Sequence, residues 1–72
     1  MVIDSLQQVF GINLRKHRKS LGLSQEEFAD LVGVHRTYVG GVERGERNLT
    51  LKSVASMCDR INVDPVDMLR RG

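Results

Sequence analysis

The stretch from Ser24 to Gly45 narrows the possible folds of this chain more than any other feature of its sequence. Two short helical patterns follow each other there, separated only by a glycine and a few residues. The first begins at Ser24, which can form a capping box with Glu27, a signature of a helix N-terminus. It runs to about Val32, where Gly33 is a natural stop. The residues expected on its inner face are Phe28, Ala29 and Val32.

The second pattern starts immediately afterwards. His35 stands in the cap position, and the helix is expected to continue to about Arg44, with Gly45 as its stop. Val39 and Val42 mark its buried side, because residues three apart share one face of a helix. Two short helices joined by a turn of about four residues that contains glycine form the helix-turn-helix arrangement.

Two glycines, Gly40 and Gly41, sit side by side inside this second pattern. Each interior glycine costs roughly 1 kcal/mol relative to alanine, so the pair either breaks the helix or serves a purpose that a side chain would obstruct. The apolar spacing around them favours a continuous helix. At about 100° per residue, both glycines point away from the core, and we expect them to leave a thin outer face open to a close partner. The side chains expected on or beside that face are Arg36, Thr37 and Arg44.

A longer helical pattern precedes this unit. It runs from about Asp4 to Leu21, with Asp4 or Ser5 as its cap and Gly22 as its stop. Its stripe, at spacings of three and four residues, consists of Leu6, Phe10, Leu14, His17 and Leu21.

Two further helices are expected after the unit. Thr50 can cap a fourth helix that runs to about Asn62, while Asp64 and Pro65 suit the cap and first position of a short fifth helix ending near Arg71. The apolar stripe of the fourth helix consists of Leu51, Val54, Met57, Cys58 and Ile61. No strand pattern is present. The sequence therefore predicts an all-α fold, with five helices around one core and a single domain over residues 1–72.

Composition excludes several classes of protein. In a chain of 72 residues one core supplies only about 3–5 kcal/mol, so a second subunit would help. Cys58 is the only cysteine, which rules out an internal disulfide and a zinc cluster, and the two histidines are not spaced as ligands. No apolar run reaches the ~18 residues of a membrane span, and the N-terminus lacks the layout of a signal peptide. We expect a cytoplasmic protein without metal, cofactor or small-molecule ligand.

Catalysis is not expected either. The sequence shows no nucleophile–base pair, carboxylate dyad or phosphate-cradling loop, and "GGVERG" lies within a helical pattern rather than after a strand. The net charge of +2 is weak evidence for a nucleic-acid partner. The basic run "RKHRK", residues 15–19, spans more than one helical turn, so much of it is expected to be a solvated face.

The sequence also resembles a known family over most of its length. The segment "LRKHRKSLGLSQEEFADLVGVHRTYVGGVERGERNLTL" is similar to the phage-repressor-like helix-turn-helix DNA-binding domain, also called the xenobiotic-response-element family. The resemblance covers about residues 10–69, and "GLSQEEFA", "LVGV" and "VERG" in register are specific together. The "HRTY...VERGERN" wording also resembles the small controller proteins of restriction–modification systems.

The resemblance implies a phage-repressor-like five-helix bundle and roles for particular residues. In this family the second helix crosses the DNA backbone and the third enters the major groove. The resemblance implies base reading by Arg36, Thr37 and the position of Gly41. It implies contacts with the DNA backbone by Gln25, Tyr38, Arg44, Arg47, Asn48 and Lys52. It also implies an internal salt bridge between Arg18 and Glu43. Gly41 departs from the family, which often has a hydrogen-bonding side chain there, and this shifts base reading to Arg36, Thr37 or flanking residues such as Arg47.

The chemistry of these residues allows both a functional and an ordinary interpretation. Arg36 suits guanine, whose O6 and N7 accept a bidentate fork worth ~1–3 kcal/mol of discrimination, but it is also an ordinary surface arginine. Gln25 stands where free N–H groups of a helix N-terminus favour a phosphate, but it also suits a polar position after a cap. Leu31 and Val66 fall off the inner faces of their helices, so each is either a dimer contact or a lone exposed apolar residue.

These features predict a homodimeric, sequence-specific transcriptional regulator. Two copies related by a two-fold axis would bind inverted-repeat operators with half-sites about one helical turn apart. The helix-turn-helix is expected at about residues 24–44 and the dimerisation region at about 50–71. With no room for a sensing domain, regulation would follow protein concentration, as in an autoregulatory controller of a restriction–modification system. The alternatives are an antitoxin-type DNA-binding protein and an interaction module that has lost DNA binding.

Overall fold

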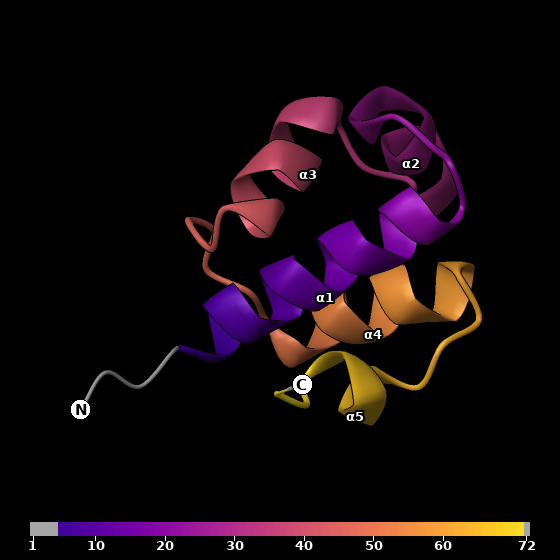
Figure 1. Ribbon diagram of the computed structural model, residues 1–72. Helices are drawn as coiled ribbons and strands as arrows, with labels where there is room; N and C mark the ends of the chain where they lie inside the picture. The colour runs from indigo at the N-terminus through magenta and orange to yellow at the C-terminus, as the bar shows by residue number, and fades with distance from the viewer. Residues whose placement is uncertain (1–4, 72) are drawn as a thin grey trace.

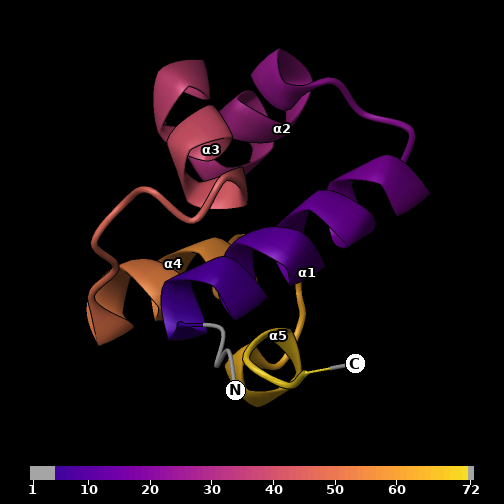
Figure 2. The same ribbon diagram turned by 60° about the vertical axis from the view of Figure 1, so that its left-hand side comes forward.

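The computed structural model describes residues 5–71, and these residues form five helices and no strand. The helices are α1 Leu6–Ser20, α2 Gln25–Val32, α3 Arg36–Glu43, α4 Leu51–Arg60 and α5 Pro65–Met68. α1 crosses the middle of the molecule, with α2 and α3 on one side and α4 and α5 on the other (Figure 1). The view turned by 60° shows the same division (Figure 2). The all-α prediction is confirmed.

Local capping chemistry sets the helix starts. Ser24 and Glu27 form the predicted capping box, with 3.1 Å from Glu27 N to Ser24 Oγ and 2.9 Å from Ser24 N to Glu27 Oε1. His35 Nδ1 accepts a hydrogen bond from Thr37 N at 3.1 Å, and Ser5 caps α1. The alternative cap Asp4 lies outside the described residues. Thr50 and Asp64 cap α4 and α5 as predicted.

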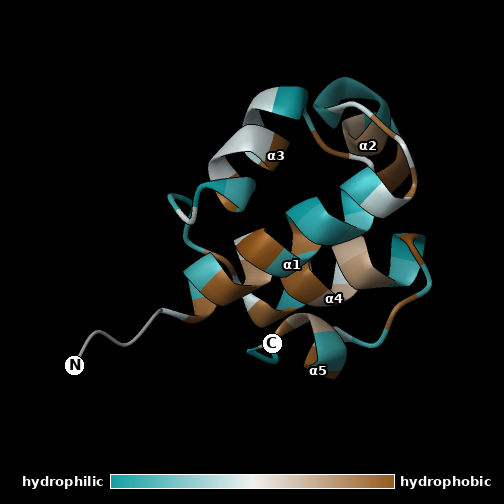
Figure 3. Ribbon diagram, viewed as in Figure 1, coloured by the Kyte–Doolittle hydropathy of each residue, from teal (hydrophilic) through white to brown (hydrophobic). Residues whose placement is uncertain are grey.

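The core is built from all five helices. Its buried side chains are Phe10, Leu14, Phe28, Ala29, Val32, Val39, Val42, Val54, Met57, Cys58 and Met68. Hydrophobic residues concentrate where α1, α4 and α5 meet, whereas much of the outer side of α2 and α3 is hydrophilic or neutral (Figure 3). Burial raises the pKa of the Cys58 thiol, with a smaller contribution from the charge of Asp64, so this cysteine is a core residue with little thiolate character.

Three predicted members of the apolar stripes are exposed. Leu51 is 84% exposed, Leu6 is 58% exposed and Leu21 is 47% exposed. Each stands at or beside the end of its helix, where no neighbouring helix continues to cover it. Periodicity alone gives the correct face of a helix, but it does not say how far along the helix the partner extends.

The last two helices end earlier than predicted. α4 ends at Arg60 rather than near Asn62, since Asn62 has a φ of 58° and leaves the helix. α5 ends at Met68 rather than near Arg71. Asn13 on α1 accounts for this end, because its Nδ2 donates to Met68 O at 2.8 Å and to Arg70 O at 3.0 Å. A side chain 55 and 57 residues away thus satisfies one carbonyl oxygen at the end of α5 and another just beyond it.

Gly11 fixes the distance between α1 and the C-terminal end of α3. A Cβ at Gly11 would overlap the carbonyl oxygen of Val42 and lie 3.0 Å from that of Glu43. The backbones therefore touch there, and α3 is held against a rigid support.

No helix within residues 5–71 is both long and apolar enough to cross a membrane.

Candidate functional site

The outer face of α3 is the candidate site. α3 is a continuous helix through Gly40 and Gly41, so the alternative that the glycine pair breaks the helix is wrong. Residues four apart lie along one row of a helix, which puts Arg36, Gly40 and Arg44 in one row and Thr37 and Gly41 in the next. Val39 and Val42 are buried in the core on the opposite side, as predicted.

The two glycines do not leave this face open, which corrects the expectation of a thin surface. Both glycines are buried. A Cβ at Gly40 would lie 3.1 Å from Arg44 Nη1, and a Cβ at Gly41 would lie 2.9 Å from Arg47 Cγ and 3.0 Å from Arg47 Nε. The glycines point away from the core as predicted, but Arg44 at the end of the helix and Arg47 in the loop after it fold back and fill the room that the glycines leave.

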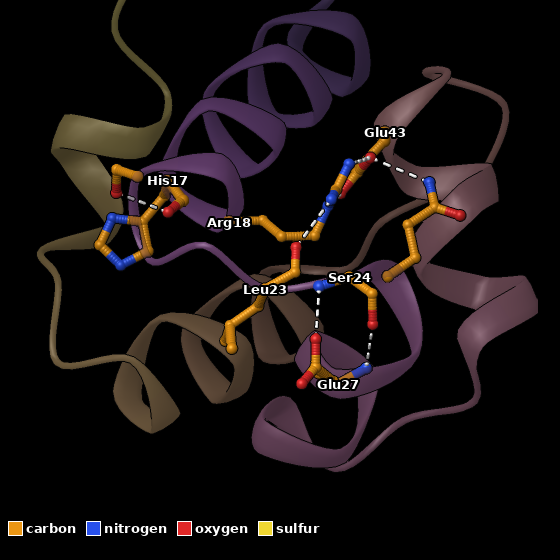
Figure 4. Close-up of polar contacts among 8 residues, drawn as sticks. His17, Arg18, Leu23, Ser24, Glu27 and Glu43 are labelled. Carbon is orange, nitrogen blue, oxygen red and sulfur yellow. Dashed lines mark hydrogen bonds and ion pairs between the residues drawn. The ribbon is translucent and has the colours of Figure 1, made fainter.

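Beneath this face lies an ion pair that is largely shielded from solvent. Arg18 on α1 donates from Nε to Glu43 Oε2 at 2.7 Å and from Nη2 to Glu43 Oε1 at 3.0 Å (Figure 4). The Arg18 side chain is 12% exposed and that of Glu43 is 4% exposed. A third bond from Arg18 Nη1 reaches Leu23 O at 2.9 Å, and Gln25 Nε2 donates to Glu43 Oε1 at 3.0 Å. The pair that the resemblance implied is thus the centre of a network joining α1, α2 and α3.

The network changes the acidity of its members. Burial alone would raise the pKa of Glu43, but hydrogen bonds from Arg18 and Gln25, with the charges of Arg18 and Arg15, outweigh burial and lower that pKa below its ordinary value. The hydrogen bond with Glu43 raises the pKa of the Arg18 guanidinium. Both groups are therefore charged at neutral pH, and the carboxylate holds the last turn of α3 against α1.

Three of the expected functional residues gather around the glycines. Gln25 and Arg44 lie over Gly40, with Arg44 Nε also 2.9 Å from Glu46 Oε1. Arg47 lies over Gly41, and its Cζ is 5.3 Å from the centroid of the Tyr38 ring.

The remaining expected residues lie around this group. Arg36 Nη1 is 3.6 Å from Glu26 Oε2, and both side chains are largely exposed. Tyr38 and Lys52 line one hollow of about 480 Å³ between α3 and α4. Thr37 and Asn48 are exposed. The roles of all these residues stay predictions.

Sequence reasoning missed several contacts of this face. Neither the covering of Gly41 by Arg47 nor the bond from Gln25 to Glu43 has a local signal, because each joins residues that only the fold brings together. The Arg36–Glu26 pair has no local sequence signal either, because its two residues lie on opposite sides of the turn between α2 and α3. The resemblance had pointed to Arg47 and Gln25 only as residues that would contact DNA.

The dimer candidates are exposed but separate. Leu31 is on α2 and Val66 on α5, and both are exposed. Neither lines the apolar hollow of about 210 Å³ between the start of α1, the start of α4 and the residue after α5. That hollow, here called the leucine groove, is lined by Leu6, Gln7, Leu49, Thr50, Leu51, Val54 and Leu69.

The groups on this face are suited to binding a partner. They are guanidinium, amide and hydroxyl donors on and beside α3. Such donors suit a partner rich in hydrogen-bond acceptors and negative charge.

Comparisons with known proteins identify relatives with the same architecture. A family model described as helix-turn-helix matches residues 14–68. The control protein C.SmaI of Serratia marcescens is 38% identical over 66 residues, which cover 92% of this chain and 79% of C.SmaI.

Two solved structures are also similar. The restriction-modification controller protein C.AhdI from Aeromonas hydrophila matches with a TM-score of 0.77 and 42% identity, over 86% of this chain and 94% of that one. The controller protein C.Esp1396I, crystallised as a tetramer in complex with its natural 35 base-pair operator, matches with a TM-score of 0.78 and 32% identity, over 92% and 87% of the two chains.

Proposed function

The chain belongs to the helix-turn-helix family, and we propose that it is a sequence-specific DNA-binding regulator of the restriction–modification controller type. The observation that carries the proposal is the outer face of α3, which carries Arg36 in its first turn and is covered by Arg44 and Arg47 over the glycines, on a helix anchored through Glu43. Regulation is by occupancy of an operator, without a chemical step.

Base reading is assigned to the start of α3. Arg36 and Thr37 are exposed in its first turn, and an exposed first turn is the part of a recognition helix that contacts base edges in the major groove. The contact between Arg36 and Glu26 is an exposed pair worth at most about 1 kcal/mol, so DNA can displace it at small cost. The Arg36 fork then suits a guanine.

Backbone contacts surround this turn. Gln25 has one amide N–H bonded to Glu43, and an amide nitrogen carries a second donor that a phosphate can accept at the α2 N-terminus. Tyr38 and Lys52, which line the same hollow, are assigned to the phosphates of the adjoining strand. Arg44 and Asn48 are assigned to the same backbone because both are exposed at the end of α3 and in the loop that follows it.

Homodimerisation is assigned to the leucine groove, one side of which belongs to the dimerisation region expected at about residues 50–71 and the other side to the start of α1. Leu51 and Leu6 are the most exposed large apolar residues on its rim, and pairing of two copies would remove them from water. A two-fold dimer would present two α3 helices to inverted half-sites. Since dimerisation and DNA binding are then coupled, occupancy rises steeply with protein concentration, which suits an autoregulatory controller in the cytoplasm.

Selection of duplexes from a random pool tests the proposal. The pool is incubated with the full chain at about 0.15 M salt, and bound duplexes are amplified and sequenced. Enrichment of an inverted repeat with half-sites about 10 base pairs apart is expected. Arg36→Ala should lose the preference at one base pair of each half-site. A pool unchanged from the input would overturn the proposal.

A further inference from the structure

We propose that Tyr38 and Gly41 form a socket for Arg47, and that Arg47 reads a base from the place where the side chain of residue 41 would otherwise stand. The inference rests on the proposed function and goes beyond it in one respect. Of the two roles that the resemblance implies for Arg47, it selects base reading over backbone contact, and it makes Gly41 and Tyr38 positioning residues for Arg47.

Two independent contacts define the socket. The Arg47 stem crosses Gly41 so closely that a Cβ there would lie 2.9 Å from Cγ and 3.0 Å from Nε. The far end of the side chain lies over the Tyr38 ring, with Cζ 5.3 Å from the ring centroid. Tyr38 and Gly41 are three residues apart and therefore neighbours on α3. Arg47 is thus laid across the recognition helix, although it belongs to the loop that follows.

The backbone fixes the root of this arginine. Glu46 N donates to Gly41 O at 2.9 Å, and Gly45 N donates to Val42 O at 3.0 Å. Gly45 has a φ of 73°, which turns the chain back toward the helix. The loop therefore returns over the last turn of α3, and Arg47 starts its path from a constrained position.

The guanidinium of Arg47 is free to bind. Within residues 5–71 it makes no hydrogen bond or ion pair, whereas Arg44 is bonded to Glu46 and Arg36 lies near Glu26. Stacking over an aromatic ring uses the face of a guanidinium and leaves the N–H donors at its edge. An arginine held by its face, with its donors unused, has the form required for a bidentate bond to guanine O6 and N7.

The socket also explains why a glycine stands at position 41. An interior helix glycine is unfavourable relative to alanine, and nothing in the hydrophobic core requires one here. The three atoms nearest to such a Cβ all belong to Arg47. Glycine at 41 and arginine at 47 are therefore coupled, since even one methyl group at 41 would force the stem of Arg47 to shift.

Base preference at single positions tests the coupling. The wild-type chain is first titrated at about 0.15 M salt against a selected duplex and against every single-base change in one half-site. Arg47→Ala and Gly41→Ala are then titrated against the same panel. Both should reduce discrimination at the same base pair by about tenfold or more and leave the other positions unchanged. Gly41→Ala combined with Arg47→Ala should show no further loss.

Two controls separate the socket from other effects. Arg44→Ala removes the arginine that lies over Gly40 and should weaken binding to all duplexes alike. Tyr38→Phe keeps the ring and should keep the base profile, whereas Tyr38→Leu removes the ring and should reduce discrimination at the Arg47 base pair. Thermal unfolding of each variant shows that it is folded.

Three results would overturn the inference. If Arg47→Ala weakens all duplexes equally and lowers the salt slope by about 1, Arg47 is a phosphate contact. If Arg47→Ala removes the preference at one base pair and Gly41→Ala leaves it intact, Gly41 does not position Arg47. If the wild-type chain itself has no base preference, the proposed function is wrong. This failure is separate from a failure of the socket, because the wild-type titration is completed before any variant is measured.

Discussion

Replacement of Gly11 by alanine should destabilise the protein, although alanine is the better helix former. The added Cβ would overlap the carbonyl oxygen of Val42 and press on that of Glu43. Both contacts are with backbone, so no side chain can rotate away. Overpacking of this kind costs about 1–3 kcal/mol and occasionally more, and the overlap places Gly11→Ala at the upper end. Better helix propensity returns about 1 kcal/mol, which leaves a net loss of about 2 kcal/mol.

Gly40→Ala is the matched control for this change. It makes the same substitution in another helix, but the atom nearest to the new Cβ is the end of the Arg44 side chain at 3.1 Å, which can move. The helix-propensity gain should therefore survive in part, and Gly40→Ala should be as stable as the wild type or up to about 1 kcal/mol more stable.

Urea and thermal unfolding, followed by circular dichroism, measure both effects. For a domain of this size 1 kcal/mol shifts Tm by about 4–8 °C, so Gly11→Ala should lower Tm by about 10 °C, with an unchanged urea m-value. If Gly11→Ala unfolds at the same temperature as Gly40→Ala, then α1 does not touch the end of α3 as described. The support of the recognition helix would then need a different explanation.

Three further changes test other parts of the structure. Arg18→Met leaves the buried Glu43 carboxylate with only Gln25 as its hydrogen-bond partner, so unfolding in urea should show a loss of about 3 kcal/mol or more; a loss under 1 kcal/mol would show that the pair is dispensable. Because the folded state lowers the pKa of Glu43, its stabilisation is complete above the ordinary value near 4.3 and is lost as pH falls through the lowered value. The stability gap between wild type and Glu43→Gln should therefore close in acid, and a gap independent of pH would contradict this. Leu51→Glu should leave stability within about 0.5 kcal/mol, since Leu51 is exposed, but shift the chain toward the monomer in sedimentation; an unchanged dimer would move the interface away from the leucine groove.

Local chemistry made most of the fold predictable. The capping box of Ser24, the cap His35 and the stop Gly33 act within a few residues, so the sequence shows them directly and the structure confirms them. The ends of α4 at Arg60 and of α5 at Met68 were harder to predict from the sequence. The α5 end depends on Asn13, whose partners lie far along the chain, and no local pattern signals that bond.

For the candidate site, too, only the features set by local sequence could be predicted. The face of α3 that carries Arg36 and Thr37 follows from helical periodicity. What covers the glycines does not, because the paths of Arg44 and Arg47 depend on how the loop returns over the helix. The expectation of a thin face was wrong for that reason. A helix wheel shows where a side chain is missing, but not which neighbour fills the room.

Whether the chain reads DNA sequence is decided by the ratio of two dissociation constants at about 0.15 M salt. One is measured on the duplex enriched by selection and the other on a duplex of the same length and composition with the half-sites scrambled. A specific regulator should prefer its site by about a thousandfold or more. A ratio near one would show that the arginines on α3 only attract phosphates, and that the chain does not read DNA sequence.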